Sequence, residues 1–81
     1  MNKPTVLLVR LDNQGNRKEI NWEVGCLCGQ GDIVEIVFFR FPTQDELYAL
    51  LPQTNSRTKW RFAEHVNWNT GGLEVLMGAY E

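Results

Sequence analysis

Apolar side chains dominate residues 33–41, and this pattern predicts the central strand of a sheet. Seven of these nine residues are apolar, and all seven are β-branched or aromatic, the types that suit a pleated, half-buried surface. Turn formers flank the stretch on both sides: Gly29, Gly31, Asp32 and Pro42. A strand that is apolar on both faces normally lies between two neighbours, so we expect the rest of the chain to pack around this one.

Two earlier stretches predict a β-hairpin. Residues 5–11 are mainly apolar and follow Pro4, which suits a strand start because proline has no N–H to donate. Residues 17–28 alternate between apolar and polar positions, and a period of two predicts a strand with one solvated face. The turn formers of residues 12–16 connect the two stretches. Because a second turn follows at residues 29–32, we expect three consecutive antiparallel strands.

Residues 42–52 carry the signals of a short helix. Thr43 can cap its N-terminus, and Glu46 can complete a capping box. An apolar stripe follows at Leu47, Leu50 and Leu51, and Pro52 ends the helix. A helix of about eight residues is not stable alone, so we expect it to lie on one face of the sheet.

The last third of the chain predicts two more strands. Within residues 57–68 one parity is apolar, at Trp60, Phe62, Val66 and Trp68. This favours a strand, although Glu64 interrupts the apolar side, and a helix capped by Ser56 is the alternative for residues 57–66. Residues 69–72 form a turn, and residues 73–80 make a final strand. The expected fold class is α+β: one domain over residues 1–81, with about five antiparallel strands in the order β-β-β-α-β-β and one short helix on one face.

Composition and charge argue against nucleic-acid-binding and membrane-spanning proteins. The formal net charge of −2 argues against general nucleic-acid binding, which needs a basic excess. No apolar run approaches the ~18 residues of a membrane span, and residues 1–4 lack the apolar segment of a signal peptide. We therefore expect a cytoplasmic protein with no membrane partner. An uncovered sheet edge would also be compatible with a homodimer.

No residue set predicts catalysis, a metal site or a cofactor. On a strand, Cys26 and Cys28 would lie about 7 Å apart on one face, too far for an unstrained disulfide. His65 is the single histidine, so a zinc site within one chain cannot be completed without carboxylates. Capping explains Asp45 and Glu46. We expect a non-enzymatic protein whose cysteines are small buried residues, with a reactive thiol or an intermolecular metal site as the alternative.

A basic stripe is the strongest candidate for a binding surface. Arg57, Lys59 and Arg61 would line one face of the expected fourth strand, with its aromatic residues on the other face. Such a stripe suits docking to an acidic protein. Because the aromatics point away from it, they would not form a stacking platform for bases. The predicted binding residues are Arg57, Lys59, Trp60, Arg61 and Tyr48.

The function that we expect is a non-enzymatic protein–protein interaction module. Small acidic domains without a catalytic set include immunity proteins and phage-encoded inhibitors of host defence complexes, and this class supplies the expectation. The alternative is a small nucleic-acid-binding regulator that uses the same basic stripe, whose affinity would fall steeply with added salt. A third hypothesis is a thiol or metal protein centred on Cys26 and Cys28.

Overall fold

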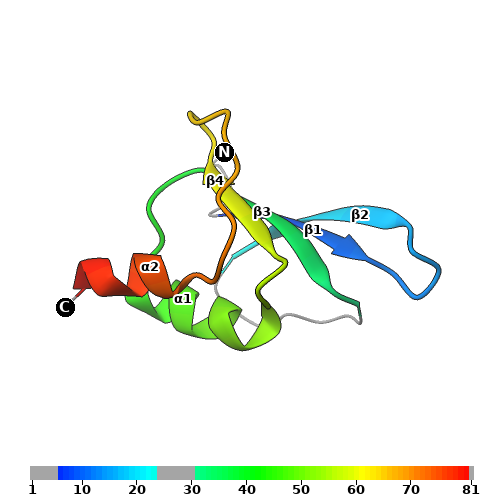
Figure 1. The fold of residues 1–81 in the computed structure, drawn as a ribbon, viewed down its shortest axis with the longest axis horizontal. Coiled ribbons are helices and arrows are strands. Elements are labelled where there is room, and N and C mark those ends of the chain that lie inside the picture. Colours follow the sequence, from blue (N-terminus) through cyan, green and yellow to red (C-terminus); the bar gives the residue numbers. More distant parts are fainter. Residues whose placement is uncertain (1–5, 24–30, 81) are drawn as a thin grey trace.

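The computed structural model describes residues 6–23 and 31–80. In this part of the chain a four-stranded mixed sheet lies against two short helices (Figure 1), which confirms the α+β class. The strands are β1 (Val6–Leu11), β2 (Arg17–Trp22), β3 (Ile33–Phe38) and β4 (Lys59–Phe62). The helices are α1 (Gln44–Leu50) and α2 (Glu74–Met77), each followed by a 3₁₀ turn, η1 (Leu51–Gln53) and η2 (Gly78–Tyr80).

The strand order in the sheet is β2-β1-β3-β4. β1 is antiparallel to both β2 and β3, so the predicted hairpin is confirmed, and β3 lies between two neighbours as expected. The expectation of three consecutive antiparallel strands is wrong, because β3 pairs with β1 and not with β2, and both β2 and β3 are antiparallel to β1. The expectation of an entirely antiparallel sheet is also wrong, because β3 and β4 are parallel. The cause is the connection between them: α1 crosses over the sheet and returns the chain to the same end, as in any β-α-β unit.

Local hydrogen bonds form the turn between β1 and β2. The Asp12 carboxylate accepts the backbone N–H groups of Gln14 at 2.8 Å and Asn16 at 2.9 Å. Gly15 supplies the positive φ, +83°, that the turn requires. The backbone hydrogen bonds from Asn16 and then Gln14 hold the pKa of the Asp12 carboxyl below its usual value.

The capping box at the start of α1 is present as the sequence predicts. The Thr43 hydroxyl accepts the N–H of Glu46 at 3.2 Å, and the Glu46 carboxylate accepts the N–H of Thr43 at 2.6 Å. Glu46 is only 1% exposed, and the guanidinium of Arg40 donates to both of its carboxylate oxygens, at 3.0 and 2.9 Å. A buried carboxylate is costly unless it is paired and hydrogen-bonded, and here it is both.

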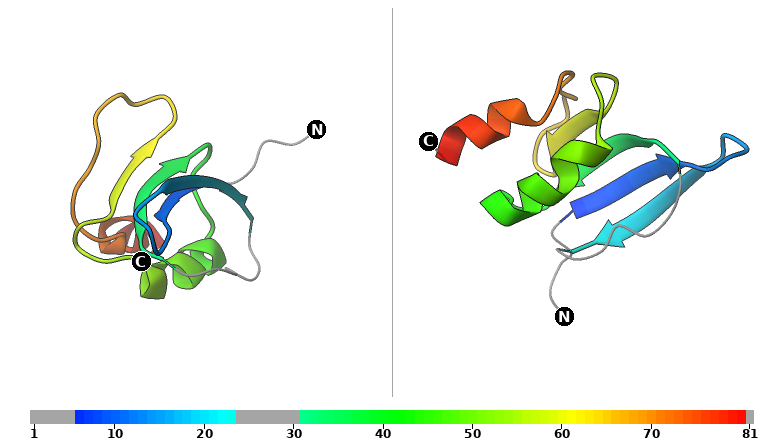
Figure 2. Two further views of the ribbon diagram at one scale, coloured as in Figure 1. Left: turned by 90° about the vertical axis from the view of Figure 1, so that its right-hand side faces the viewer. Right: turned by 90° about the horizontal axis from the view of Figure 1, so that it is seen from below.

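The hydrophobic core fills the space between the sheet and the helices. Both helices lie on one face of the sheet (Figure 2), so this face is called the helical face. The fully or nearly fully buried apolar residues of the core are Val6, Leu8, Trp22, Ile33, Ile36, Phe38, Leu47, Leu50, Trp60, Leu73 and Leu76. No helix in the described ranges is both long enough and apolar enough to cross a membrane.

The final strand expected at residues 73–80 is wrong, since this segment forms α2 and η2. Leu73 and Leu76 are 1% and 6% exposed, while Val75 between them is 68% exposed. Burial at positions three residues apart is typical of a helix and not of a strand. A short apolar run fits either period, and packing decides between them. The outer edge of β4 is already paired with Asn69 at Trp60, so a fifth strand has no free place beside that residue.

The fourth strand is confirmed but shorter than the pattern suggested. Residues 59–62 are strand rather than helix, and the chain turns at residues 63–64. The expected element order β-β-β-α-β-β is therefore corrected to β-β-β-α-β-α. Cys26, Cys28 and the expected continuation of the second strand over residues 24–28 lie outside the described residues.

Candidate binding surface

The face of the sheet opposite the helices carries the predicted basic residues. Side chains that are directly opposite in register share a face. One row across the sheet is Glu19, Val9, Glu35 and Lys59, and the next is Asn21, Leu7, Val37 and Arg61. We call these eight residues, together with Trp68, the open face. No helix of the described residues lies on it (Figure 2).

Arg61 fastens the loop that follows β4. Its Nη1 donates to the carbonyl oxygen of His65 at 2.8 Å, with a longer bond to that of Ala63 at 3.3 Å. Its guanidinium carbon lies 4.9 Å from the ring centroid of Trp68, within range of a cation–π interaction. One side chain thus holds the loop and positions an aromatic ring beside the basic residues.

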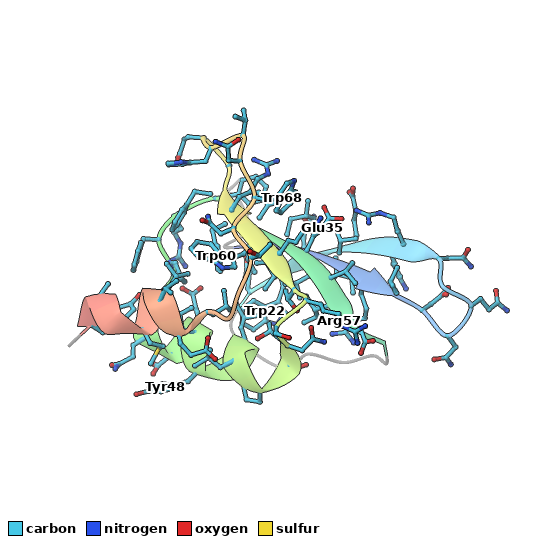
Figure 3. All side chains as sticks on the ribbon, in the orientation of Figure 1. Trp22, Glu35, Tyr48, Arg57, Trp60 and Trp68 are labelled. Carbon is cyan, nitrogen blue, oxygen red and sulfur yellow. The ribbon has the colours of Figure 1, made fainter. Side chains whose placement is uncertain are left out.

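Trp68 reaches the open face because the chain reverses after β4. Two backbone hydrogen bonds, of 3.0 and 2.8 Å, pair Asn69 with Trp60 in an antiparallel bridge. Asn69 is therefore on the side of Trp60, and the residue before it lies on the opposite side. Figure 3 shows Trp68 above the sheet with Glu35, while Trp60 and Trp22 lie between the sheet and the helices.

The expectation that Trp68 shares a face with Trp60 is therefore wrong. It assumed one uninterrupted strand, but the strand ends at Phe62 and the alternation starts anew after the turn. Glu64, which interrupts the apolar parity, was the one signal in the sequence for this break. Trp68 is 37% exposed, and sequence reasoning missed it as a candidate binding residue.

Charge is unevenly distributed over the open face. Glu35 forms an ion pair with Arg17 of β2, although its register partner on β4 is Lys59. Lys59 is exposed and forms no ion pair with any described residue. The β4 side of the open face therefore carries an ammonium group that pairs with no described carboxylate, beside the Arg61–Trp68 pair, while Glu19 lies at the β2 side. Val9 and Val37, between these charged chains, are 6% and 7% exposed.

The other predicted binding residues do not join this surface. Trp60 is 6% exposed, and its ring packs edge-on against Phe38 at 6.3 Å between centroids, so it belongs to the core. Tyr48 is 56% exposed but lies on α1, on the far side of the molecule from Trp68 (Figure 3). Arg57 is exposed in the turn before β4, at the edge of a cavity of about 150 Å³ that Leu11, Asp32, Ile33, Val34 and Asn55 also line. Of the five predicted residues, only Lys59 and Arg61 lie on the open face.

His65 is part of a separate aromatic cluster near the C-terminal 3₁₀ turn. Its ring lies 6.1 Å from that of Phe62, which stacks on the 48%-exposed Phe41 at 5.8 Å. Tyr80 lies 5.8 Å from Phe41. Within residues 6–23 and 31–80, no group of three His, Cys, Asp or Glu side chains is placed to hold a metal ion.

Comparison of the chain with models of protein families, with curated proteins and with solved structures gave no match.

Proposed function

We propose that the protein is a non-enzymatic interaction module that binds another protein through the β4 side of its open face. The observation that carries this proposal is the grouping of Lys59, Arg61 and Trp68 on a sheet face that no described helix covers. Surfaces that bind proteins are enriched in tryptophan and arginine, and complementary charge selects the partner.

The partner that best fits this surface presents carboxylates. Lys59 has no ion pair with the described residues, and the bonds of Arg61 to loop carbonyls all come from Nη1. Its Nη2 and Nε are thus not hydrogen-bonded to the described part of the chain. A guanidinium that is already oriented by its loop and by Trp68 loses less side-chain freedom on binding than a free arginine would. An inhibitor or immunity-type protein that docks on an acidic surface would have this design.

One observation favours a second candidate, binding of single-stranded nucleic acid. Trp68 lies on the basic side of the sheet rather than away from it, and a tryptophan beside cations can stack on a base. Against it, Glu19 and Glu35 share the same face, and the formal net charge is −2. Phosphate backbones are repelled by such carboxylates, so protein binding remains the main proposal.

The test is capture of partners by the tagged protein from a lysate of the organism that makes it, with nuclease added and with mass spectrometric identification. Lys59→Gln should weaken capture and Lys59→Glu should weaken it further, since the second change reverses the charge. Trp68→Ala should abolish capture, because it removes the aromatic ring of the proposed surface. The matched control is Tyr48→Ala, which removes an exposed aromatic from the opposite side and should capture the partner as well as the unchanged protein.

Circular dichroism should show that all four variants keep the fold, because each changed side chain lies outside the core. A partner that is retained by Lys59→Glu and Trp68→Ala, or lost in Tyr48→Ala, would refute the proposed surface. Partners that disappear when nuclease is added would favour the nucleic-acid alternative. In that case affinity for single strands should fall steeply as salt is raised.

A further inference from the structure

β2 is an edge strand of the sheet that the described residues form. It is the first strand in the sheet order, and no strand of the described residues pairs with its outer side. Both helices lie away from it, toward the other end of the sheet (Figure 2). An edge of this kind is a template for pairing with another strand.

The directions of the backbone hydrogen bonds of β1 show which N–H and C=O groups of β2 point outward. The N–H of Leu11 donates to the carbonyl oxygen of Asp32, on the β3 side, at 2.9 Å. Because N–H directions alternate along a strand, the odd-numbered residues of β1 face β3 and the even-numbered ones face β2. The register pairs Leu8 with Ile20, so the even-numbered residues of β2 face β1. The N–H and C=O groups of the odd residues, such as Glu19 and Asn21, therefore point outward.

The charges along this edge run from positive to negative. Arg17 and Lys18 begin β2, while Glu19 lies in its middle and Glu23 follows its last residue. A second copy of the strand in antiparallel orientation brings the basic start of one copy against the acidic end of the other. The edge is thus complementary to itself.

Like-charge contacts exclude the neighbouring symmetric registers. Centring the pair of strands on Lys18 or on Glu19 places that residue opposite its own copy, and centring on Asn21 places Glu19 opposite Glu23. Like charges directly opposite each other destabilise a strand pair. Centring on Ile20 avoids every such contact and places Arg17 of each copy opposite Glu23 of the other.

We infer that the protein forms a symmetric homodimer, in which β2 pairs antiparallel with β2 of a second copy and Ile20 lies at the centre. In this register Glu19 of one copy meets Asn21 of the other, so the outward N–H and C=O groups exchange hydrogen bonds. Ile20, which is half-buried at the margin of the core, is covered by its own copy. The two four-stranded sheets become one continuous sheet, with both open faces on the same side.

The experiment is sedimentation velocity of the purified chain over a range of concentrations. The unchanged protein should approach twice the mass of the chain as concentration rises. Glu23→Arg should raise the dissociation constant of the dimer by about tenfold or more, because two ion pairs become two arginine–arginine contacts. The double variant Arg17→Glu/Glu23→Arg restores opposite charges and should restore dimerisation.

Two further variants separate pairing from folding. Asn21→Pro removes an outward N–H while leaving the hydrogen bonds to β1, so it should give a folded monomer, whereas Asn21→Ser should remain dimeric. Glu35→Gln removes the ion pair with Arg17 inside the chain and should not weaken the dimer. A chain that is monomeric at every concentration would overturn the inference. So would a Glu23→Arg variant that dimerises normally, or a folded charge-swap variant that stays monomeric. None of these outcomes bears on the binding proposed for Lys59 and Trp68.

Discussion

At the scale of single residues, two glycines differ in how much an added side chain would destabilise the fold. Gly31 has φ +117°, and a Cβ there would collide with the carbonyl oxygen of Leu11, whose N–H donates to the carbonyl oxygen of Asp32. Gly15 has φ +83° and open space around it. Both positions strain any L-residue, but only Gly31 also lacks room.

We expect Gly31→Ala to lower the free energy of unfolding by about 3–5 kcal/mol, as the sum of backbone strain and a steric clash. Gly15→Ala should cost about 1 kcal/mol, since strain alone acts there. Urea denaturation of the two variants measures both values. Equal losses would show that the contact between Gly31 and Leu11 is not a tight one.

At the scale of elements, α2 depends on the core rather than on its own helix propensity. It has four residues, and no side chain caps its N-terminus, so it would not form in isolation. Leu73 and Leu76 hold it by burial, and α1 lies next to it. The spacing of the buried side chains along this segment, which differs between a helix and a strand, is therefore the feature to test.

Leu76→Ala should lower the free energy of unfolding by about 2–4 kcal/mol, because it empties a buried site. Val75→Ala is the matched control and should change it by less than about 0.5 kcal/mol, since Val75 is 68% exposed. Thermal or urea unfolding provides the comparison. A larger loss for Val75→Ala than for Leu76→Ala would indicate a strand in which residues 73, 75 and 77 are buried.

At the scale of the whole molecule, the three tryptophans report on the two faces of the sheet. Trp22 and Trp60 are 4% and 6% exposed on the helical face, whereas Trp68 is 37% exposed on the open face. Acrylamide should therefore quench mainly the fluorescence of Trp68. Trp68→Phe should remove most of the quenchable emission, and Trp60→Phe should leave it. The opposite result would place Trp68 in the core and remove the aromatic part of the proposed surface.

The sequence alone determined the features that depend on neighbouring residues. The hairpin turn forms from hydrogen bonds within residues 12–16, and the capping box links Thr43 to Glu46 three positions later. Strand periodicity placed Lys59 and Arg61 on one face and Trp60 in the core, because alternation is a property of the strand itself. The central strand was evident from its apolar residues.

Only the tertiary structure decided the features that depend on contacts between distant segments. β4 is parallel to β3 because α1 crosses the sheet, and residues 73–80 are helical because Leu73 and Leu76 pack into the core while Val75 stays exposed. The reversal of the chain after β4 places Trp68 on the open face, where Arg61 lies beside its ring, and lets Arg61 donate hydrogen bonds to the loop carbonyls. A short apolar run satisfies both the helical and the strand period, so packing against the rest of the molecule has to choose between them.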